Sequence, residues 1–322
     1  MKKKLIEVEN LKKYYPVTAG LLSRHVADVR AVDGVSFYIM DKETLGLVGE
    51  SGCGKSSLGR ALLRLEEPTL GRVLYKGSDI MSWDKKQLKE LRKEAQMIFQ
   101  DPQSSLDPRM TIGDSIGEAL LIHEVGTESE RLERVEKLLK QVGLEPEHAM
   151  RYPHELSGGQ KQRIGIARAL AVNPKLIVAD EPVSALDVSI QAQILNLMTD
   201  LKHERDLAYL FIAHDLSVIG HVSDRIAVMY LGQIVELAGR TELLGHPLHP
   251  YTEALLSAIA TPDPHQKQKK ISLQGEVPSP VDPPPGCRFH TRCPRAMKIC
   301  SQKQPTLRPR EEDHLVSCHL YG

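Results

Sequence analysis

Long hydrophobic runs are missing from this sequence of 322 residues. The longest apolar stretches, such as residues 176–179, are strand-sized and fall far short of the roughly 20 residues that a helix needs to cross a bilayer. The N-terminus starts with Met1 and three lysines, but Glu7 follows before any apolar core of a signal peptide begins. We therefore expect a chain that is itself soluble, with no signal peptide and no membrane span.

An excess of either charge is also lacking. Lysine plus arginine equals aspartate plus glutamate, at 42 each, so the formal net charge is zero. Because no overall field would draw such a protein onto nucleic acid or an anionic bilayer, any contact of that kind must be local. Hydrophobic residues still make up 41% of the chain, which is enough to bury a full core, and the length suggests about two domains.

Cysteine is scarce, and its five copies are unevenly placed. Four of them lie near the C-terminus with the spacing C-x5-C-x6-C-x17-C, at Cys287, Cys293, Cys300 and Cys318. Two stable disulfides are unexpected in the reducing interior of a cell. Four thiolates suit tetrahedral zinc or a [4Fe–4S] cluster instead, and free structural thiols are the remaining alternative.

Strand-like and helix-like segments alternate along the chain, which predicts a mostly parallel sheet covered on both faces. The expected strands include residues 35–40, 45–48, 176–179, 209–213 and 226–229. The expected helices include residues 57–65, 85–93, 130–139 and 191–203. Five prolines between Val277 and Cys287 then predict a stiff extended connector, because proline fixes φ and removes the N–H donor.

A glycine-rich segment, Gly49-Glu50-Ser51-Gly52-Cys53-Gly54-Lys55-Ser56, fits the P-loop pattern between a predicted strand and a predicted helix. Its glycines let backbone N–H groups surround the β- and γ-phosphates of ATP, and the start of the helix adds partial positive charge. Lys55 is expected to contact the β- and γ-phosphate oxygens, and the Ser56 hydroxyl to ligate Mg²⁺. The residues predicted to bind ATP here are Gly49, Ser51, Gly52, Cys53, Gly54, Lys55, Ser56 and Ser57.

Two acids, Asp180 and Glu181, directly follow the apolar run 176–179. In a P-loop protein such a pair holds the metal and activates water. Asp180 is expected to hold Mg²⁺, and Glu181 to accept a proton from the attacking water.

The segment Leu156-Ser157-Gly158-Gly159-Gln160 resembles the signature of ABC-transporter ATPases. It predicts the start of a second helix, whose N–H groups are free to bind a γ-phosphate. In that family the phosphate belongs to ATP held by the opposite subunit, which implies that role for Ser157, Gly158, Gly159 and Gln160. The resemblance also implies an α/β fold, namely a P-loop NTPase core of the ABC ATPase type with an inserted helical subdomain and a C-terminal Cys-containing extension. The expected ranges are 1–102 and 166–245 for the core, 103–165 for the helical subdomain and 246–322 for the extension.

Other residues match the remaining ABC ATPase motifs in the correct order. By resemblance, Gln100 senses Mg²⁺ and the lytic water, Asp187 touches the partner's site, and His214 contacts the γ-phosphate. An aromatic residue near the N-terminus should stack on adenine. Of the adjacent Tyr14 and Tyr15 we favour Tyr15, although a shift of one residue would exchange them.

Several further segments resemble the ATPase subunits of bacterial dipeptide and oligopeptide importers, in particular the second of the two ATPase paralogues of the dipeptide type. These segments are 101–109, 151–156, 181–189, 249–256 and 275–280. The resemblance implies a paralogous ATPase partner, two transmembrane permease subunits, an indirect link to a substrate-binding protein, and a place at the cytoplasmic face of the membrane. A nickel importer, or an importer of another solute, is the alternative within this subfamily.

The tail of this subfamily resembles a cluster-binding one, which favours [4Fe–4S] over zinc at the four cysteines. Arg288, Arg292, Arg295 and Lys298 are expected to offset the charge of the cluster. Because the ATP motifs all lie upstream, ATP binding is expected to survive the loss of these cysteines.

A non-transport ABC ATPase that moves nucleic acid is the rival functional class. The single cassette, the lack of heptads and the zero net charge disfavour it.

Overall fold

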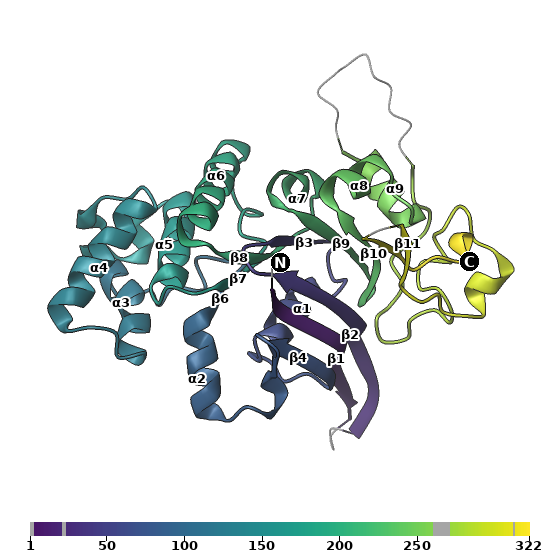
Figure 1. The fold of residues 1–322 in the computed structure, drawn as a ribbon, viewed down its shortest axis with the longest axis horizontal. Coiled ribbons are helices and arrows are strands. Elements are labelled where there is room, and N and C mark those ends of the chain that lie inside the picture. The colour runs from purple at the N-terminus through teal and green to yellow at the C-terminus, as the bar shows by residue number, and fades with distance from the viewer. Residues whose placement is uncertain (1–2, 21–23, 260–270, 312) are drawn as a thin grey trace, which may run out of the picture. The chain divides into compact units, whose positions relative to one another are not determined.

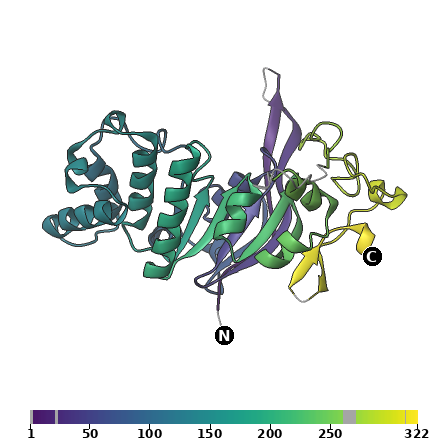
Figure 2. The ribbon, with the colours of Figure 1, turned by 90° about the horizontal axis from the view of Figure 1, so that it is seen from above.

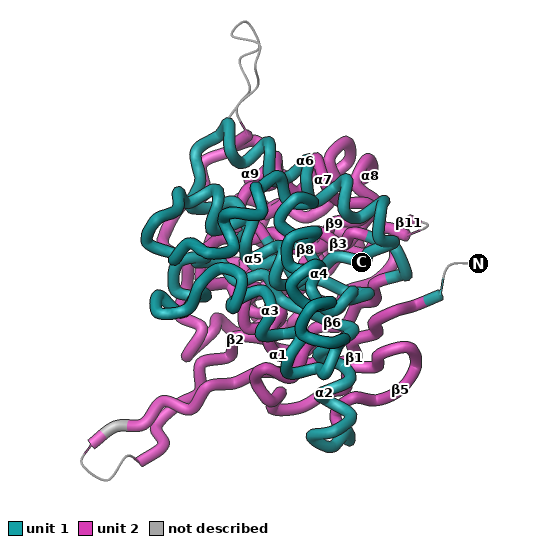
Figure 3. Tube along the Cα trace, turned by 90° about the vertical axis from the view of Figure 1, so that its left-hand side faces the viewer, with its two compact units in different colours: residues 1–3, 40–43, 82–212 teal, residues 4–39, 44–81, 213–322 magenta. Residues whose placement is uncertain are grey.

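The computed structural model describes residues 3–20, 24–259, 271–311 and 313–322. The chain forms two compact units, which are drawn in different colours in Figure 3 and are described here one at a time. Unit 1 comprises residues 1–3, 40–43 and 82–212, and unit 2 comprises residues 4–39, 44–81 and 213–322. The predicted division into core, helical subdomain and extension stays a prediction.

Three strands of unit 1 pair in parallel: β7 (Leu176–Asp180) lies between β6 (Ala95–Ile98) and β8 (Ala208–Ala213) (Figure 1). Every residue of β7 and β8 is buried, as the apolar runs in the sequence predict. Helix α2 (Lys85–Glu94) leads into β6, and α6 (Val188–Arg205) joins β7 to β8; the two helices confirm the predictions for residues 85–93 and 191–203.

The remaining helices of unit 1 pack on one another. They are α3 (Ile112–Ile122), α4 (Glu128–Gln141) and α5 (Gly158–Leu170), with short 3₁₀ turns η2 (Pro146–Met150) and η3 (Pro153–Glu155) before α5. Helix α4 begins with a capping box, in which the Thr127 hydroxyl accepts from the N–H of Glu130 and the Glu130 carboxylate accepts from the N–H of Thr127. Its buried Val135, Leu138 and Leu139 follow the helical spacing and confirm the helix predicted at 130–139.

In unit 2, β3 (Thr44–Val48) runs parallel to β9 (Arg225–Tyr230). A two-residue turn, with Leu231 and Gly232 both at positive φ, then leads to the antiparallel strand β10 (Gln233–Gly239). Helices α7 (Leu216–Val222) and α8 (Arg240–Gly245) pack against β3 and β10. The predicted strands at 45–48 and 226–229 are thereby confirmed.

A separate antiparallel sheet, in the order β2-β1-β4-β5, completes this part of unit 2. Its strands are β1 (Lys4–Ala19), β2 (Arg24–Met40), β4 (Leu70–Tyr75) and β5 (Ser78–Asp79), and a 3₁₀ turn, η1 (Ile80–Ser82), follows β5. Strand β2 contains the predicted strand 35–40, but the sequence did not predict this second sheet. Helix α1 (Lys55–Leu62) contacts β1.

The C-terminal part of unit 2 starts with α9 (Pro250–Ser257). Residues 271–297 contain no helix or strand, in agreement with the predicted connector. The 3₁₀ turn η4 (Lys298–Ser301) is followed by two strands, β11 (Arg308–Glu311) and β12 (His314–Val316), and by a last 3₁₀ turn, η5 (His319–Tyr321). Strand β12 pairs with β10 and with β11, so both strands extend the sheet that contains β10. Figure 2 shows this yellow segment beside the green strands of the same unit. Among the described residues, no helix is both long enough and apolar enough to be a candidate membrane span.

Candidate nucleotide-binding site

The predicted P-loop joins the end of β3 to the start of α1, so it has the expected strand–loop–helix setting. Two of its glycines are required by close backbone contacts. A Cβ atom on Gly54, which has φ 105, would lie 1.9 Å from the carbonyl oxygen of Ala31, and a Cβ on Gly49 would lie 2.1 Å from that of Met229. No side chain fits at either position, and the loop therefore depends on glycine at both.

Lys55 is the first residue of α1 and is only 4% exposed. Its Nζ lies 2.8 Å from the carbonyl oxygen of Gly49 and 3.1 Å from that of Glu50. Cys53 is also buried, and burial raises the pKa of its thiol. Ser51 and Gly52 are exposed, while Ser56 and Ser57 are half-buried at the start of α1. A lysine and a helix N-terminus at one glycine-rich loop are the features that a phosphate group requires.

The two candidate adenine-stacking tyrosines make different contacts. The Tyr14 hydroxyl donates to Asp33 at 2.5 Å, and burial together with this hydrogen bond raises the pKa of Tyr14 to about 12. The Tyr15 hydroxyl contacts Glu66 and lies 3.3 Å from Oγ of Ser57, the residue after the P-loop motif. Tyr15 is therefore the one whose hydroxyl reaches helix α1, and the choice of Tyr15 over Tyr14 as the adenine contact stays a prediction.

His214 also belongs to unit 2 and follows the last residue of β8. Its side chain is exposed, at the edge of a cavity of about 400 Å³. The other lining residues are Asp215, Leu216, Ser217, Leu255, Ala258 and Ile259. Unit 2 thus holds Tyr15, the P-loop and His214.

Unit 1 holds the two predicted acids and Gln100. Asp180 ends β7 and is 1% exposed, whereas Glu181 comes one residue later and is half-buried. Nε2 of Gln100 donates a hydrogen bond to Oε2 of Glu181 at 3.2 Å, so the structure brings these two predicted site residues together. Glu181 has φ 44, in the left-handed region where a residue with a side chain is strained.

The signature segment begins α5 in unit 1, as predicted. Ser157 caps the helix, since its hydroxyl accepts from the N–H of Gln160 at 3.3 Å and the Gln160 side chain accepts from the N–H of Ser157 at 2.9 Å. Ser157 and Gly158 are exposed, so the positive end of the helix faces outward.

Asp187 caps the neighbouring helix α6. Its carboxylate accepts from the Ser189 hydroxyl at 2.6 Å and from the N–H of Ile190 at 3.0 Å. The hydrogen bond from Ser189 lowers the pKa of Asp187. A Cβ atom on Gly159 would lie 2.8 Å from Cγ2 of Ile190, so the signature helix lies against the start of α6.

The four C-terminal cysteines lie near one another but do not form a metal site in this structure. Burial, together with smaller contributions from the neighbouring thiols of Cys300, Cys318 and Cys293, raises the pKa of Cys287 to about 11. In the part of the chain that the structure describes, no group of three or more His, Cys, Asp or Glu side chains is placed to hold a metal ion. The structure therefore gives no support to the predicted [4Fe–4S] cluster.

The basic residues expected to offset the charge of a cluster have other partners. Arg292 pairs with Glu50 of the P-loop. Arg288 pairs with Asp33, and Arg295 pairs with Glu253. Each of these arginines is thus already paired with a carboxylate of unit 2. The contact between Arg292 and the P-loop was not predicted, because its partners lie 242 residues apart and no sequence motif links them.

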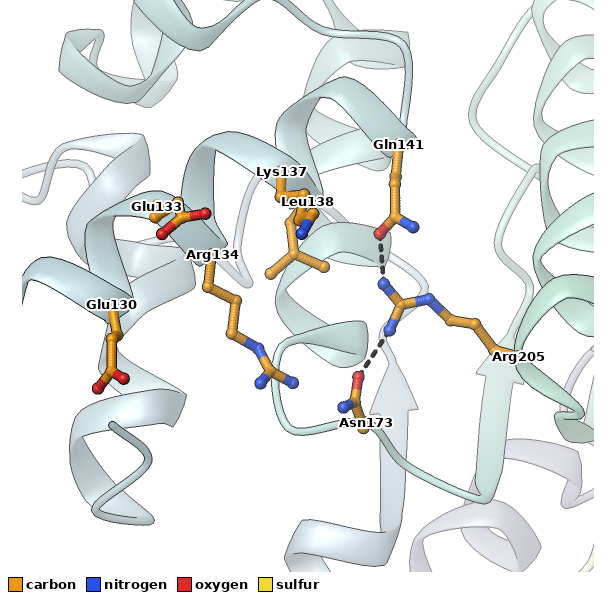
Figure 4. Close-up of a pocket in the computed structure, with 8 residues that line it drawn as sticks. All are labelled: Glu130, Glu133, Arg134, Lys137, Leu138, Gln141, Asn173 and Arg205. Carbon is orange, nitrogen blue, oxygen red and sulfur yellow. Dashed lines mark hydrogen bonds between the residues drawn. The ribbon is translucent and has the colours of Figure 1, made fainter. Parts of the chain in front are cut away.

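A cavity of about 430 Å³ lies in unit 1 and is shown in Figure 4. The side chain of Arg205 lines this cavity and donates hydrogen bonds to Asn173 and Gln141. No predicted ATP-site residue lines this cavity, which belongs to the surface of α4 and its neighbours. The lining residues are Glu130, Glu133, Arg134, Lys137, Leu138, Gln141, Asn173 and Arg205.

Comparison with known proteins agrees with this geometry. The family described as ABC transporter matches residues 32–184, and the family described as Oligopeptide/dipeptide transporter, C-terminal region, matches residues 235–300. The dimeric post-hydrolysis structure of the ATP-binding cassette MJ0796 bound to ADP and Pi is similar, with a TM-score of 0.65 and 29% identity. That match covers 73% of this chain and 98% of the other.

Two curated relatives are similar over nearly their full lengths. The chain is 56% identical to the oligopeptide transport ATP-binding protein AppF of Bacillus subtilis, over 99% of this chain and 98% of the relative. It is 49% identical to the di/tripeptide transport ATP-binding protein DppF of Pseudomonas aeruginosa, over 98% of this chain and 97% of the relative. The fold and the loop define a nucleotide-binding ATPase of the ABC class. Within this class, the chain belongs to the family of oligopeptide and dipeptide transport ATP-binding proteins.

Proposed function

We propose that this chain is the ATP-binding and ATP-hydrolysing subunit that powers import of dipeptides or oligopeptides across the cytoplasmic membrane. The observation that carries the proposal is the P-loop on β3 and α1, with buried Lys55, in a chain that aligns with peptide-transport ATP-binding proteins from end to end. Of the two paralogues in such systems, we assign it to the second, dipeptide-importer type.

ATP binding is assigned to the P-loop, with Lys55 as the charge for the β- and γ-phosphates and Tyr15 as the adenine contact. Ser56, Asp180 and Gln100 are the residues that would hold Mg²⁺, which neutralises phosphate charge when it is bound. A hydroxyl, a carboxylate and an amide are oxygen donors of the kind that Mg²⁺ prefers. The contact of Gln100 with Glu181 supports a shared role for these two residues.

We assign the Glu181 carboxylate as the group that accepts the proton from the attacking water. We assign His214 as a contact of the γ-phosphate. The exposed N-terminus of α5 carries Ser157, Gly158, Gly159 and Gln160, and the exposed N-terminus of α6 carries Asp187. We assign them to the ATP of a partner ATPase subunit, because an exposed helix N-terminus favours an anion. Two such subunits would close on two ATP molecules and open after hydrolysis.

The assembly that we propose is a pair of paralogous ATPase subunits with two permease subunits, at the cytoplasmic face of the membrane. A substrate-binding protein would deliver the peptide, and no nucleic acid takes part. The zero net charge supports this last point.

A [4Fe–4S] cluster on Cys287, Cys293, Cys300 and Cys318 is a separate proposal, which rests on the spacing of the four cysteines in the sequence. Anaerobically purified protein should be brown and should lose this colour when each cysteine is changed to serine. A colourless sample with stoichiometric zinc would assign the thiols to zinc. A sample with neither metal would leave them as structural thiols.

Uptake by whole cells tests the transport proposal. A strain that lacks this chain should lose uptake of a labelled dipeptide, and the wild-type chain should restore it while Lys55→Ala should not. Loss of ⁶³Ni²⁺ uptake with normal dipeptide uptake would favour a nickel importer instead. Normal uptake of both, with the chain copurifying with nucleic acid, would favour a non-transport ABC ATPase.

A further inference from the structure

The cysteine-containing tail reaches the P-loop through Arg292. Nη1 of Arg292 lies 2.7 Å from Oε2 of Glu50, and Nη2 lies 3.1 Å from Oε1, so the two side chains form a two-point ion pair. The Arg292 side chain is 8% exposed and the Glu50 side chain 27%. Hydrogen bonding to Glu50 raises the pKa of Arg292, and planar two-point pairs of this kind are among the strongest in proteins.

The backbone of Glu50 is held as well. Its N–H donates to the hydroxyl of Tyr251 at 2.9 Å, and its carbonyl oxygen accepts from Nζ of Lys55 at 3.1 Å. Tyr251 belongs to α9 and is fully buried. The second residue of the P-loop is thus fixed at its side chain, its N–H and its carbonyl, and two of these three contacts come from beyond residue 249.

A buried aromatic cluster supports both contacts. The ring centroid of Tyr230 lies 4.8 Å from that of Tyr251 and 5.2 Å from that of Phe289, and the Arg292 guanidinium lies 5.9 Å from the Tyr230 centroid. Phe289 and Arg292 both lie between Cys287 and Cys293. Because close-packed interiors transmit displacements, a shift of this segment would move Arg292.

We propose that Arg292 is a positioning residue for ATP binding. It neutralises Glu50 and fixes the P-loop, so the tail segment 287–293 sets the affinity of the loop for nucleotide. Without Arg292, an unpaired carboxylate would stand in the loop that receives the triphosphate, and like charges at short range repel strongly where water is partly excluded. The inference rests on residues 49–56 being the nucleotide loop, and it depends neither on the transported solute nor on a metal at the cysteines.

Equilibrium binding of MgATP to the purified full-length chain tests this proposal. We expect Arg292→Ala to raise the Kd about tenfold, equivalent to about 1.4 kcal/mol. Arg292→Lys should recover part of the affinity, because lysine keeps the charge but loses the two-point geometry. Arg295→Ala is the matched control: Arg295 lies in the same module, on the other side of Cys293, and pairs with Glu253 of α9 instead of the P-loop. The control should bind MgATP like the wild type.

A rescue experiment separates a charge effect from misfolding of the tail. The double variant Arg292→Ala with Glu50→Gln removes the unpaired carboxylate, and it should bind MgATP several-fold more tightly than Arg292→Ala alone. Equal Kd values for Arg292→Ala and Arg295→Ala would overturn the proposal, and so would a double variant that stays as weak as Arg292→Ala. Lys55→Ala tests the P-loop assignment separately. If it binds MgATP normally, the nucleotide loop itself is wrongly placed; if it loses MgATP while Arg292→Ala does not, only the role of Arg292 fails.

Discussion

Replacing Glu181 by glutamine should stop ATP hydrolysis and leave ATP binding intact. The change swaps one carboxylate oxygen for an amide of nearly the same shape. The hydrogen bond from Gln100, now 3.2 Å long, remains possible because the amide oxygen of the new side chain can accept it. The surroundings of the site are thus preserved while the proton acceptor is lost.

The backbone at this position supports the same expectation. The N–H of Glu181 donates to the carbonyl of Ile212 at 3.0 Å, and its carbonyl accepts from the hydroxyl of Ser184 at 3.1 Å. These bonds hold the strained φ of 44 whichever of the two side chains is present. Only the chemistry of the side chain differs between the wild type and the variant.

A positioned general base contributes on the order of 10²- to 10⁴-fold to a rate. Since each factor of ten corresponds to about 1.36 kcal/mol, the activation barrier should rise by roughly 2.7–5.4 kcal/mol. Single-turnover hydrolysis of radiolabelled ATP, measured beside the Kd for MgATP, separates the two effects. A hydrolysis rate within a few-fold of the wild type would show that Glu181 is not the base. A large rise in Kd would show that the carboxylate serves binding instead.

Three other substitutions test the remaining parts of the account. Lys55→Ala should abolish MgATP binding in a filter or dialysis assay, because it removes the charge at the centre of the loop; unchanged affinity would refute the assignment. Ser157→Arg should retain MgATP binding to its own P-loop but reduce hydrolysis in the assembled pair, and loss of binding comparable to that of Lys55→Ala would contradict the shared site. His314→Ala removes a 2.7 Å hydrogen bond to the fully buried Glu236, and should destabilise the pairing of β12 with β10 by ~1.5–3 kcal/mol. Amide exchange in β12 measures this loss, and unchanged protection would count against the contact.

The strands of the parallel sheets were predictable because they are buried on both faces and appear as short apolar runs. Strand β7, with five buried residues in succession, is an example. The long strands β1 and β2 were less visible. In β1, apolar positions alternate with charged ones and a proline interrupts the pattern, which weakens the strand signal in the sequence. Pairing of β1 with β4, some 60 residues away, decides its conformation.

The candidate site was predictable wherever one short motif contains its own geometry. The P-loop and the caps of α5 and α6 are local, so the order of residues is enough to place them. Arg292 and Tyr251 escaped prediction because their contacts with Glu50 depend on how distant segments fold together. The expectation that ATP binding survives the loss of the tail cysteines did not take this contact into account. The Arg292 variants test whether the tail segment affects ATP binding.

The most direct test of the central claim is ATP turnover by the complete transporter in proteoliposomes, with and without peptide-loaded binding protein. The account predicts that peptide-loaded binding protein raises turnover in the wild-type complex and that Glu181→Gln in this chain lowers the stimulated rate. Two results would contradict it. In the first, turnover does not change with peptide-loaded binding protein but rises with nickel-loaded binding protein. In the second, the stimulated rate is the same with Glu181→Gln as with the wild type.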